Sequence, residues 1–451
     1  MDNKYKKPLR ILLDSDSLKS DVAKRLLNYF DNELFEFVSL GSSKTHTVVQ
    51  LSLSDKNDIS GIVIDKLGDK LHGYKESTMF GYKISDIKII AESLDIKYDD
   101  FILTFILKTL LGVSEDKKVI LVTERKKLLS RLNWARNGFP ELPAQSILSP
   151  EEAIIFIDLY CKNKNKFLIA PNYYVNRGLW YLYSLKTKVK NYQKVWSIIV
   201  YGQKHIPRGD DLMDITASLG DRIIDLLTAI DEIGINYYSG VNNDTQDATI
   251  YHFNYLITLF TGVFDSLAWI SKYRYQIKFD QFERIGLRKD RQKDFMKLLY
   301  QENGKIKDFL SQNSSLINLT YSPRDLIIHR ARLKALRFDN RNDNFYFNMI
   351  RVPQDFFNHI VALSKENGSK LGEWGHYKLD NEYFLEPYRF VKMAAEKLII
   401  FVDEYLNLLG FDGYLKTMPV LSKKLKEGNS SDSHKDFLKQ LEIFDKFKLG
   451  Y

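Results

Sequence analysis

The spacing of apolar residues changes once along this chain of 451 residues, and the change limits the folds that it can adopt. In residues 1–170, short apolar runs alternate with stretches whose apolar residues recur at helical spacing. The run 117–123, KKVILVT, is short, β-branched and bounded by charge, which is typical of a central strand. Beyond residue 211 the helical period dominates. This pattern predicts an α/β domain with a mostly parallel sheet, followed by an all-α helical bundle.

The sequence divides into four expected segments. They are an α/β domain at 1–170, an aromatic and basic connector at 171–210, a helical domain at 211–412, and a polar loop with a C-terminal helix at 413–451. In the first segment we expect strands at 10–14, 35–40, 61–65 and 117–123, and helices at 84–94, 98–112, 124–138 and from Ser149–Pro150 onward. In the third we expect helices at 211–236, 245–275, 290–312, 322–337, 353–366 and 384–410, with an isolated strand at 345–352.

Composition excludes several classes of protein. The single cysteine, Cys161, rules out an intramolecular disulfide and a cysteine-rich zinc site, and its apolar surroundings predict a core position. The longest apolar stretch, 255–270, is interrupted by Asp265 and is too short to span a bilayer, so we expect a core helix and no membrane association. The N-terminal apolar run is broken by Asp14, unlike a signal peptide, so we expect a cytoplasmic protein. A net charge of +8 suits a protein that meets RNA or DNA.

The stretch 324–329, RDLIIH, places groups for phosphodiester chemistry on one expected helix. Ser322 and Pro323 are typical of an N-cap and a first helical position, so we expect Arg324 in the first turn. His329 lies five residues later, about 140° past a full turn, so the two side chains are not stacked, but they can converge on one groove beside the helix because arginine is long. A histidine can exchange a proton with a ribose 2′-hydroxyl or a leaving oxygen, and an arginine can hold charge on phosphoryl oxygens.

The same stretch has a structural interpretation, which the pattern leaves open. Arg330, Arg332, Lys334 and Arg337 follow the histidine, as on an amphipathic helix with a solvated basic face. If the helix binds RNA, these four side chains are the expected phosphate contacts.

Residues 205–410 resemble the HEPN superfamily of helical bundles, which are commonly dimeric and in many cases metal-independent ribonucleases of toxins and defence systems. The family motif is an arginine, a polar residue, and a histidine after four to six intervening positions, which Arg324, Asp325 and His329 match. The resemblance implies that Arg324 and His329 are catalytic, that Asp325 orients them, and that no cofactor is needed. It also implies RNA as substrate, a homodimer through the helical domain, and a regulatory or antitoxin partner. The expected strand at 345–352 departs from the simplest members.

Acidic residues lie where strands are expected to end in the N-terminal domain. Asp14 and Asp16 follow the first strand, Asp100 begins a helix, and Glu124 follows the strand 117–123. Such carboxylates can converge at one edge of a parallel sheet and bind Mg²⁺ or Mn²⁺. The order of elements resembles a PIN-like nuclease domain, where acids in these places hold the metal. An open alternative is that they cap helices and complement helix dipoles.

We therefore expect a metal-independent endoribonuclease of a bacterial toxin or antiphage defence system, which cleaves RNA by 2′-hydroxyl attack in its helical domain. Two alternatives stay open. One is a metal-dependent PIN-type nuclease that uses the N-terminal acids. The other is a non-catalytic sensor or scaffold that binds RNA or protein.

Overall fold

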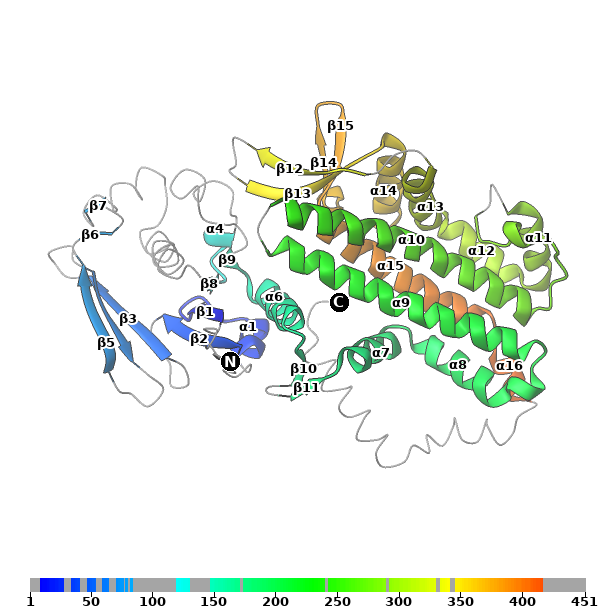
Figure 1. Cartoon of the computed structure of the whole chain (residues 1–451), viewed down its shortest axis with the longest axis horizontal. Helices are drawn as coiled ribbons and strands as arrows, with labels where there is room; N and C mark the ends of the chain where they lie inside the picture. Colours follow the sequence, from blue (N-terminus) through cyan, green and yellow to red (C-terminus); the bar gives the residue numbers. More distant parts are fainter. Residues whose placement is uncertain are drawn as a thin grey trace. The chain divides into compact units, whose positions relative to one another are not determined.

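The computed structural model forms two compact units. It describes residues 9–27, 34–40, 47–53, 59–64, 70–76, 78–79, 82–83, 119–129, 147–170, 173–239, 242–288, 292–329, 333–340 and 345–416. The N-terminal unit runs from Met1 to Val175 with two short later segments, and the helical unit comprises Asn176–Phe338 and Tyr346–Asp445 (Figure 1).

A seven-stranded sheet forms the N-terminal unit, in the order β5-β4-β3-β2-β1-β8-β9. Its strands are β1 Leu9–Asp14, β2 Phe35–Leu40, β3 Thr47–Leu53, β4 Ile59–Ile64, β5 Lys70–Glu76, β8 Val119–Val122 and β9 Ile147–Leu148. Strands β3, β2, β1, β8 and β9 pair in parallel, whereas β4 pairs antiparallel with both β3 and β5. The expected parallel sheet is therefore present, extended by an antiparallel β4–β5 hairpin. Two further strands, β6 Thr78–Met79 and β7 Tyr82–Lys83, form a separate pair.

Strands β1 and β8 occupy the centre of the parallel region. Leu12 and Leu13 of β1 and Leu121 of β8 are fully buried, because central strands covered on both faces bury successive side chains. β2 lies on one side of β1 and β8 on the other, so the order of connections reverses between β1 and β8. Their carboxyl ends bring residues 14–17 and 123–125 to the same edge of the sheet.

Helix α6, Pro150–Asn163, begins where the sequence predicted. Ser149 Oγ accepts a hydrogen bond from the Glu152 amide at 3.2 Å, and the Glu152 carboxylate accepts one from the Ser149 amide at 3.0 Å. This reciprocal capping box, with Pro150 at the first position, fixes the helix start by local chemistry alone. Cys161 is fully buried in α6, and burial raises the pKa of its thiol to about 12, so the expected core role is confirmed.

Two expected helices, at 84–94 and 98–112, lie outside the described residues, as does Asp100. Of the helix expected at 124–138, the described part is α4, Lys126–Leu129. Among the described residues of this unit, α1 spans Asp21–Leu27, and a small hairpin, β10 Phe167–Ala170 with β11 Tyr173–Val175, follows α6.

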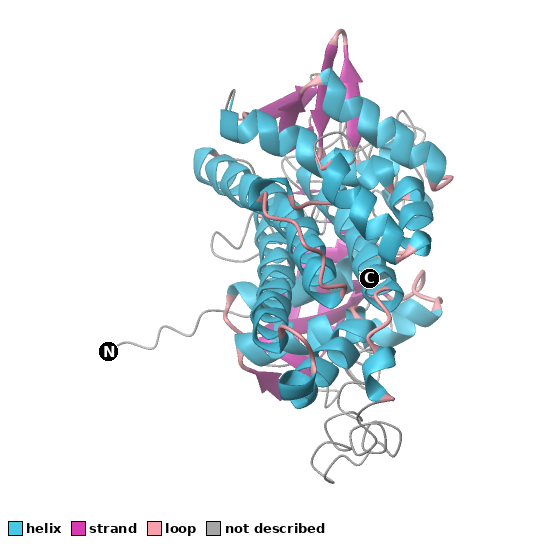
Figure 2. Ribbon diagram, turned by 90° about the vertical axis from the view of Figure 1, so that its right-hand side faces the viewer, coloured by secondary structure: helices cyan, strands magenta, loops and turns pink. Residues whose placement is uncertain are grey.

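Helices form most of the second unit, and Figure 2 draws all helices of the chain in cyan. The described α-helices of this unit are α7 Arg177–Lys188, α8 Lys190–Gly202, α9 Gly209–Tyr237, α10 Asn243–Arg274, α11 Lys293–Glu302, α12 Gly304–Gln312, α13 Ser314–His329, α14 Gln354–Glu366, α15 Pro387–Leu408 and α16 Asp412–Leu415. Helices α9 and α10 lie along each other over most of their length (Figure 1). Aromatic rings pack between α15 and α10. The ring centroids of Phe264 and Phe401 lie 5.0 Å apart, and those of Phe253 and Phe390 lie 5.7 Å apart. The expected helical body is therefore confirmed.

The segment 171–210, expected to be a connector, contains α7 and α8, and both pack against α9. The Tyr192 hydroxyl donates to the Thr216 carbonyl of α9 at 3.1 Å. The backbone amide of Asn191 donates to Asp403 of α15 at 2.7 Å. The aromatic residues of this segment are mixed with lysines, which hid their helical spacing. In the fold, buried Trp180, Tyr181 and Tyr192 belong to the face of α7 and α8 that packs on α9, while Lys190 and Lys194 are exposed.

Two helix predictions were wrong in their boundaries. The helix expected at 290–312 is two helices, because Asn303 has extended backbone and its side chain accepts from the Lys305 amide at 3.1 Å, which starts α12. The helix expected at 322–337 begins at Ser314, ends at His329, and is followed by strand β12, Ala335–Asn340. Ser322 and Pro323 thus lie inside α13. Buried Leu316 and other apolar side chains upstream hold the helix together through the proline.

The strand expected at 345–352 is present as β13, but it is not isolated. It lies in a four-stranded sheet of order β12-β13-β15-β14, with β14 His376–Leu379 and β15 Glu382–Leu385. The Asn348 amide on β13 is 3.5 Å from Thr245 Oγ1 at the start of α10, so this sheet packs beside one end of the long helices (Figures 1 and 2).

Helix α10 is long and apolar enough to cross a membrane by length and composition. In its most apolar window, however, 72% of the helix is buried inside the structure. That burial is what a central helix of a folded unit requires, so the core helix expected at 255–270 is confirmed.

Candidate functional site

Arg324 is the residue of the RDLIIH stretch whose side chain the structure describes. It is half-buried on α13, about three turns after the helix begins at Ser314, rather than in a first turn. Asp325 and His329 lie on the same continuous helix, and His329 is its last residue. Their side chains lie outside the described part of the structure. The backbone therefore keeps all three motif residues on one rigid element, as the sequence predicted.

A hydrogen-bonded pair links α13 to α10 one turn before Arg324. The hydroxyl of buried Tyr321 donates to Asp265 Oδ1 at 2.8 Å. Desolvation raises the pKa of the Asp265 carboxyl, although Tyr321, Arg324 and Arg222 all favour its ionised form. Burial and the neighbouring Asp265 raise the pKa of Tyr321 well above its ordinary value. The Asp265 carboxyl thus lies among apolar residues of α10. The neutral phenol of Tyr321 and the two arginines stabilise it there.

Three arginines from different elements surround this pair, and we call Arg222, Arg288 and Arg324 the arginine cluster. Arg222 and Arg324 interact electrostatically with Asp265, and Arg288 interacts with Tyr321, whose ring lies 5.6 Å from its guanidinium carbon. Two of the three guanidinium groups thus act on the Asp265 carboxyl, and the third lies over the Tyr321 ring. Planar guanidinium groups match the oxygens of a phosphate, so among the described residues of the helical unit this cluster is a candidate phosphodiester site.

The chain positions each arginine by a specific contact. Arg222 crosses α10 at Gly262, where an added Cβ would lie 1.7 Å from Arg222 Nη1. Glycine at 262 therefore leaves the space through which Arg222 approaches Asp265. The Arg288 backbone amide donates to Gln292 Oε1 at 3.0 Å, and its carbonyl accepts from the Gln292 amide at 3.0 Å, which closes the turn that carries it.

His359 of α14 is a second histidine beside the cluster. It is half-buried and interacts electrostatically with Arg288. Burial is the main cause and lowers its pKa, Asp355 opposes this, and Arg288 adds a smaller lowering. The imidazole is thus favoured in its neutral form, in which one ring nitrogen can accept a proton.

The four basic residues expected to contact RNA do not share a helix. α13 ends at His329, and Arg337 belongs to strand β12. Lys334 is exposed, while Arg330, Arg332 and the side chain of Arg337 lie outside the described residues. A helical basic face over 330–337 was therefore a wrong prediction, because the chain leaves the helix to join the sheet.

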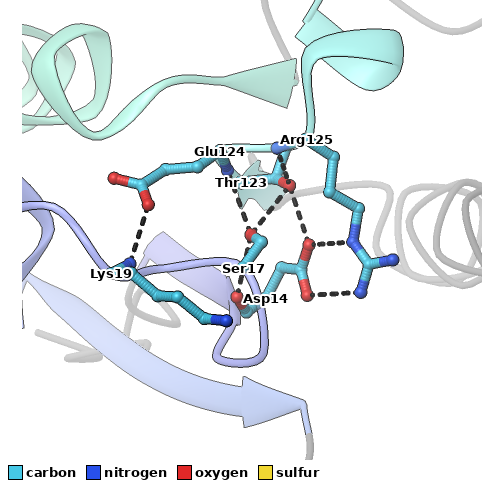
Figure 3. Close-up of polar contacts among 6 residues, drawn as sticks. All are labelled: Asp14, Ser17, Lys19, Thr123, Glu124 and Arg125. Carbon is cyan, nitrogen blue, oxygen red and sulfur yellow. Dashed lines mark hydrogen bonds and ion pairs between the residues drawn. The ribbon is translucent and has the colours of Figure 1, made fainter.

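Asp14 and Glu124 of the N-terminal unit accept hydrogen bonds from other residues of the same unit (Figure 3). Asp14 is buried at the end of β1, where its Oδ2 accepts from Thr123 Oγ1 and from Arg125 Nε, both at 2.7 Å. Arg125 Nη2 donates to the other oxygen of Asp14 at 3.2 Å. The guanidinium of Arg125 thus supplies the positive charge that this buried carboxylate requires.

Glu124 faces the start of α1. Its carboxylate accepts from the backbone amides of Lys19 at 2.7 Å and Ser20 at 3.2 Å. Desolvation is the largest single cause and raises its pKa, but these bonds and one from the Ser20 side chain together outweigh it, so the pKa lies below its ordinary value. Ser20 Oγ in turn accepts from the Ala23 amide at 3.0 Å, so Ser20, rather than Asp16, caps α1. Glu124 therefore acts as a helix-start anion, the alternative that the sequence left open.

These residues do not fit a metal site in the part of the chain that the structure describes. Both oxygens of Asp14 bind Arg125, Glu124 binds backbone amides, Asp16 is exposed, and Asp100 is not described. Among described residues, no group of three or more acidic, histidine or cysteine side chains is placed to hold a metal ion. A divalent ion at Asp14 would have to displace the guanidinium.

The sequence pointed to Arg324 but not to its neighbours. Tyr321, Arg222, Arg288 and His359 carried no recognisable spacing, since they come from separate helices. Asp265 did carry a signal, because a carboxylate within an otherwise apolar helix requires a polar partner. Comparison with protein-family models, with curated proteins and with solved structures finds no match.

Proposed function

We propose that the helical unit is a metal-independent endoribonuclease in which Arg324 and His329 are catalytic. The observation that carries this proposal is the convergence of the arginine cluster on the Asp265–Tyr321 pair, next to the helix that holds His329. Arg324 is thereby embedded among further cations, as a phosphodiester requires, rather than being one arginine of a solvated helical face.

The proposed reaction needs only groups on this chain and the RNA. His329 accepts the proton of the ribose 2′-hydroxyl as the O2′–P bond forms. The P–O5′ bond breaks, and the leaving 5′-oxygen takes a proton from an acid, either a second histidine or water. The products are a 2′,3′-cyclic phosphate and a 5′-hydroxyl. Arg324 stabilises the charge that develops on the non-bridging oxygens, and Asp325 orients the pair.

The setting of this activity follows from the resemblance to HEPN proteins. We propose a cytoplasmic toxin or antiphage role, a homodimer through the helical unit, and a regulatory partner that restrains the enzyme. The N-terminal unit, which we propose to be PIN-like in fold, serves as a structural or sensory domain, because Arg125 already neutralises Asp14. A metal-dependent nuclease there has less support than the arginine site.

The experiment is cleavage of bulk cellular RNA by the purified full-length chain in EDTA. We expect the wild-type protein to cut, and Arg324→Ala and His329→Ala each to lower the rate by about 10²-fold or more. Arg284→Ala and His205→Ala are matched controls, since both residues are exposed and lie outside the arginine cluster. All variants should keep the wild-type circular dichroism spectrum.

Other outcomes would select the alternatives. If the wild type does not cleave RNA in EDTA, and Arg324→Ala and His329→Ala both cleave it in Mn²⁺, the N-terminal acids would be the active site. Salt-dependent RNA binding without cleavage under either condition would identify a non-catalytic RNA-binding protein.

A further inference from the structure

A pocket of about 330 Å³ opens between the first turns of α9 and the last turns of α10. It is lined by Asp211, Asp214, Ile215, Trp269 and Tyr273. Two carboxylates and two aromatic rings thus line one space between two packed helices. Such a combination of apolar walls and a few polar groups is typical of a ligand site.

Aromatic rings make one wall of the pocket. Trp269 and Tyr273 are one helical turn apart on α10, with ring centroids 5.6 Å apart and planes at 40°. Phe282 extends the wall, since its ring lies 5.7 Å from Trp269 and its side chain is 58% exposed. Phe282 is the exposed ring of this wall, whereas Trp269 and Tyr273 are half-buried, so a stacked nucleobase would share their ring faces with neighbouring side chains.

Cations lie at the rim of this wall. Lys272 Nζ is 4.9 Å from the Trp269 ring centroid and 4.5 Å from that of Phe282. The guanidinium carbon of Arg208 is 5.3 Å from the Tyr273 ring, and Arg208 forms an ion pair with Asp211. Asp211 therefore already has a cationic partner. The exposed Asp214 is the second carboxylate that lines the pocket, and Lys272 lies beside the aromatic wall, where it is the nearby cation for a ligand's phosphate.

We propose that this pocket binds one unpaired guanine base. A carboxylate accepts hydrogen bonds only, and guanine is the RNA base whose Watson–Crick edge offers two adjacent donors, N1–H and N2–H, to a single carboxylate. Adenine and cytosine each offer a single amino group next to an acceptor, and uracil offers one N–H between two acceptors. Asp214 then reads the base edge while Trp269 and Tyr273 stack against its face.

The pocket lies on the same helix pair as the arginine cluster. Arg222 is eight residues after Asp214 on α9, a rise of about 12 Å, and Asp265 is four residues before Trp269 on α10. Ser218, between them on α9, is 3.4 Å from Arg222 Nε. A single RNA strand following α9 and α10 would therefore meet both places. This extension rests on the proposed function, and it makes the guanine a specificity determinant for cleavage nearby.

The test measures binding of trinucleotides to the full-length chain by calorimetry. The probes are the 2′-deoxy sequences AGA, AAA, ACA and ATA, which lack the attacking hydroxyl and stay intact, together with guanosine monophosphate. We expect AGA to bind about tenfold more tightly than the other three. Asp214→Asn should remove this preference, because an amide offers one acceptor and one donor to two donors. Asp308→Asn, an equal charge change on exposed α12, should keep it.

Each result decides a separate question. Equal affinity for all four trinucleotides, or an unchanged preference in Asp214→Asn, would overturn the guanine site. Guanosine monophosphate binding as tightly as AGA would mean that the pocket holds a free nucleotide and would overturn the strand path. If AGA is preferred but the chain cleaves no RNA, the guanine site is supported and the ribonuclease proposal is wrong. If the chain cleaves RNA through His329 but shows no preference for AGA, the ribonuclease proposal is supported and the guanine site is wrong.

Discussion

The Tyr321 hydroxyl and the Asp265 carboxylate, 56 positions apart in the chain, are joined by a 2.8 Å hydrogen bond at the base of the arginine cluster. This bond links α13 to α10, and Arg324, one turn later on α13, acts on the same carboxyl. The proposed active site therefore depends on a contact that belongs to the core of the helical unit. Disturbing it should change both stability and phosphate recognition.

Asp265→Asn should change the pH dependence of stability. Burial raises the pKa of Asp265 in the folded chain above its ordinary value near 3.8, so as pH rises the unfolded chain ionises first and the wild type loses stability across that window. The amide keeps a hydrogen-bond acceptor for Tyr321 and does not titrate. We expect the variant to gain stability relative to the wild type as the pH rises above the ordinary carboxyl pKa near 3.8, measured by urea unfolding. A difference that stays constant with pH would contradict this.

Asp265→Ala, which leaves the Tyr321 hydroxyl without its partner, should cost about 1–3 kcal/mol.

Gly262→Ala should displace Arg222 while preserving the fold. The added methyl group would overlap the end of a flexible side chain, so Arg222 can move, and alanine favours the helix by up to about 1 kcal/mol. We expect the free energy of unfolding to change by less than about 1 kcal/mol, with RNA cleavage reduced by about tenfold as one cation leaves the cluster. Gly304→Ala, where an added Cβ meets nothing within 4 Å, is the control. Equal activities of the two variants would show that Arg222 has no part in the site.

Gly220→Ala should instead destabilise the helical unit. Its added Cβ would lie 2.2 Å from the hydroxyl of Tyr192, which is buried and donates to the Thr216 carbonyl. Tyr192 has little room to move, so α8 must shift from α9 or lose that bond. We expect a loss of about 2–3 kcal/mol in the free energy of unfolding. An unchanged midpoint of denaturation would mean that α8 packs less closely on α9 than the contact between Tyr192 and Gly220 implies.

Asp14→Ala should act on stability and leave cleavage intact. The substitution removes the partner of Arg125, whose side chain is only 27% exposed, and should cost about 2–4 kcal/mol. The rate of RNA cleavage in EDTA should match the wild type at a temperature where both proteins are folded. Added Mn²⁺ should not raise the Tm of the wild type, because Arg125 occupies Asp14. A rise in Tm with Mn²⁺ that disappears in Asp14→Ala would restore the metal site as a candidate.

The elements that the sequence predicted well are those specified by local chemistry. Ser149, Pro150 and Glu152 define the start of α6 within four residues, and the run 117–123 could only be buried as a central strand. The helices α9 and α10 followed from their apolar spacing. Local signals failed where tertiary contacts opposed them. Ser322–Pro323 has the form of a helix start, yet buried residues upstream continue the helix through it.

By itself, the sequence determined that an α/β part precedes a helical body and that Arg324, Asp325 and His329 share one helix. The tertiary structure alone decided which charges meet. It joined Asp265 to Tyr321 across 56 positions, closed Arg125 onto Asp14 across 111, and brought Asp214 opposite Trp269 in one pocket. Helical period and capping act within a turn or two and can be read along the chain. Pairing between distant side chains depends on how helices and strands pack, and that packing is set by the whole core at once.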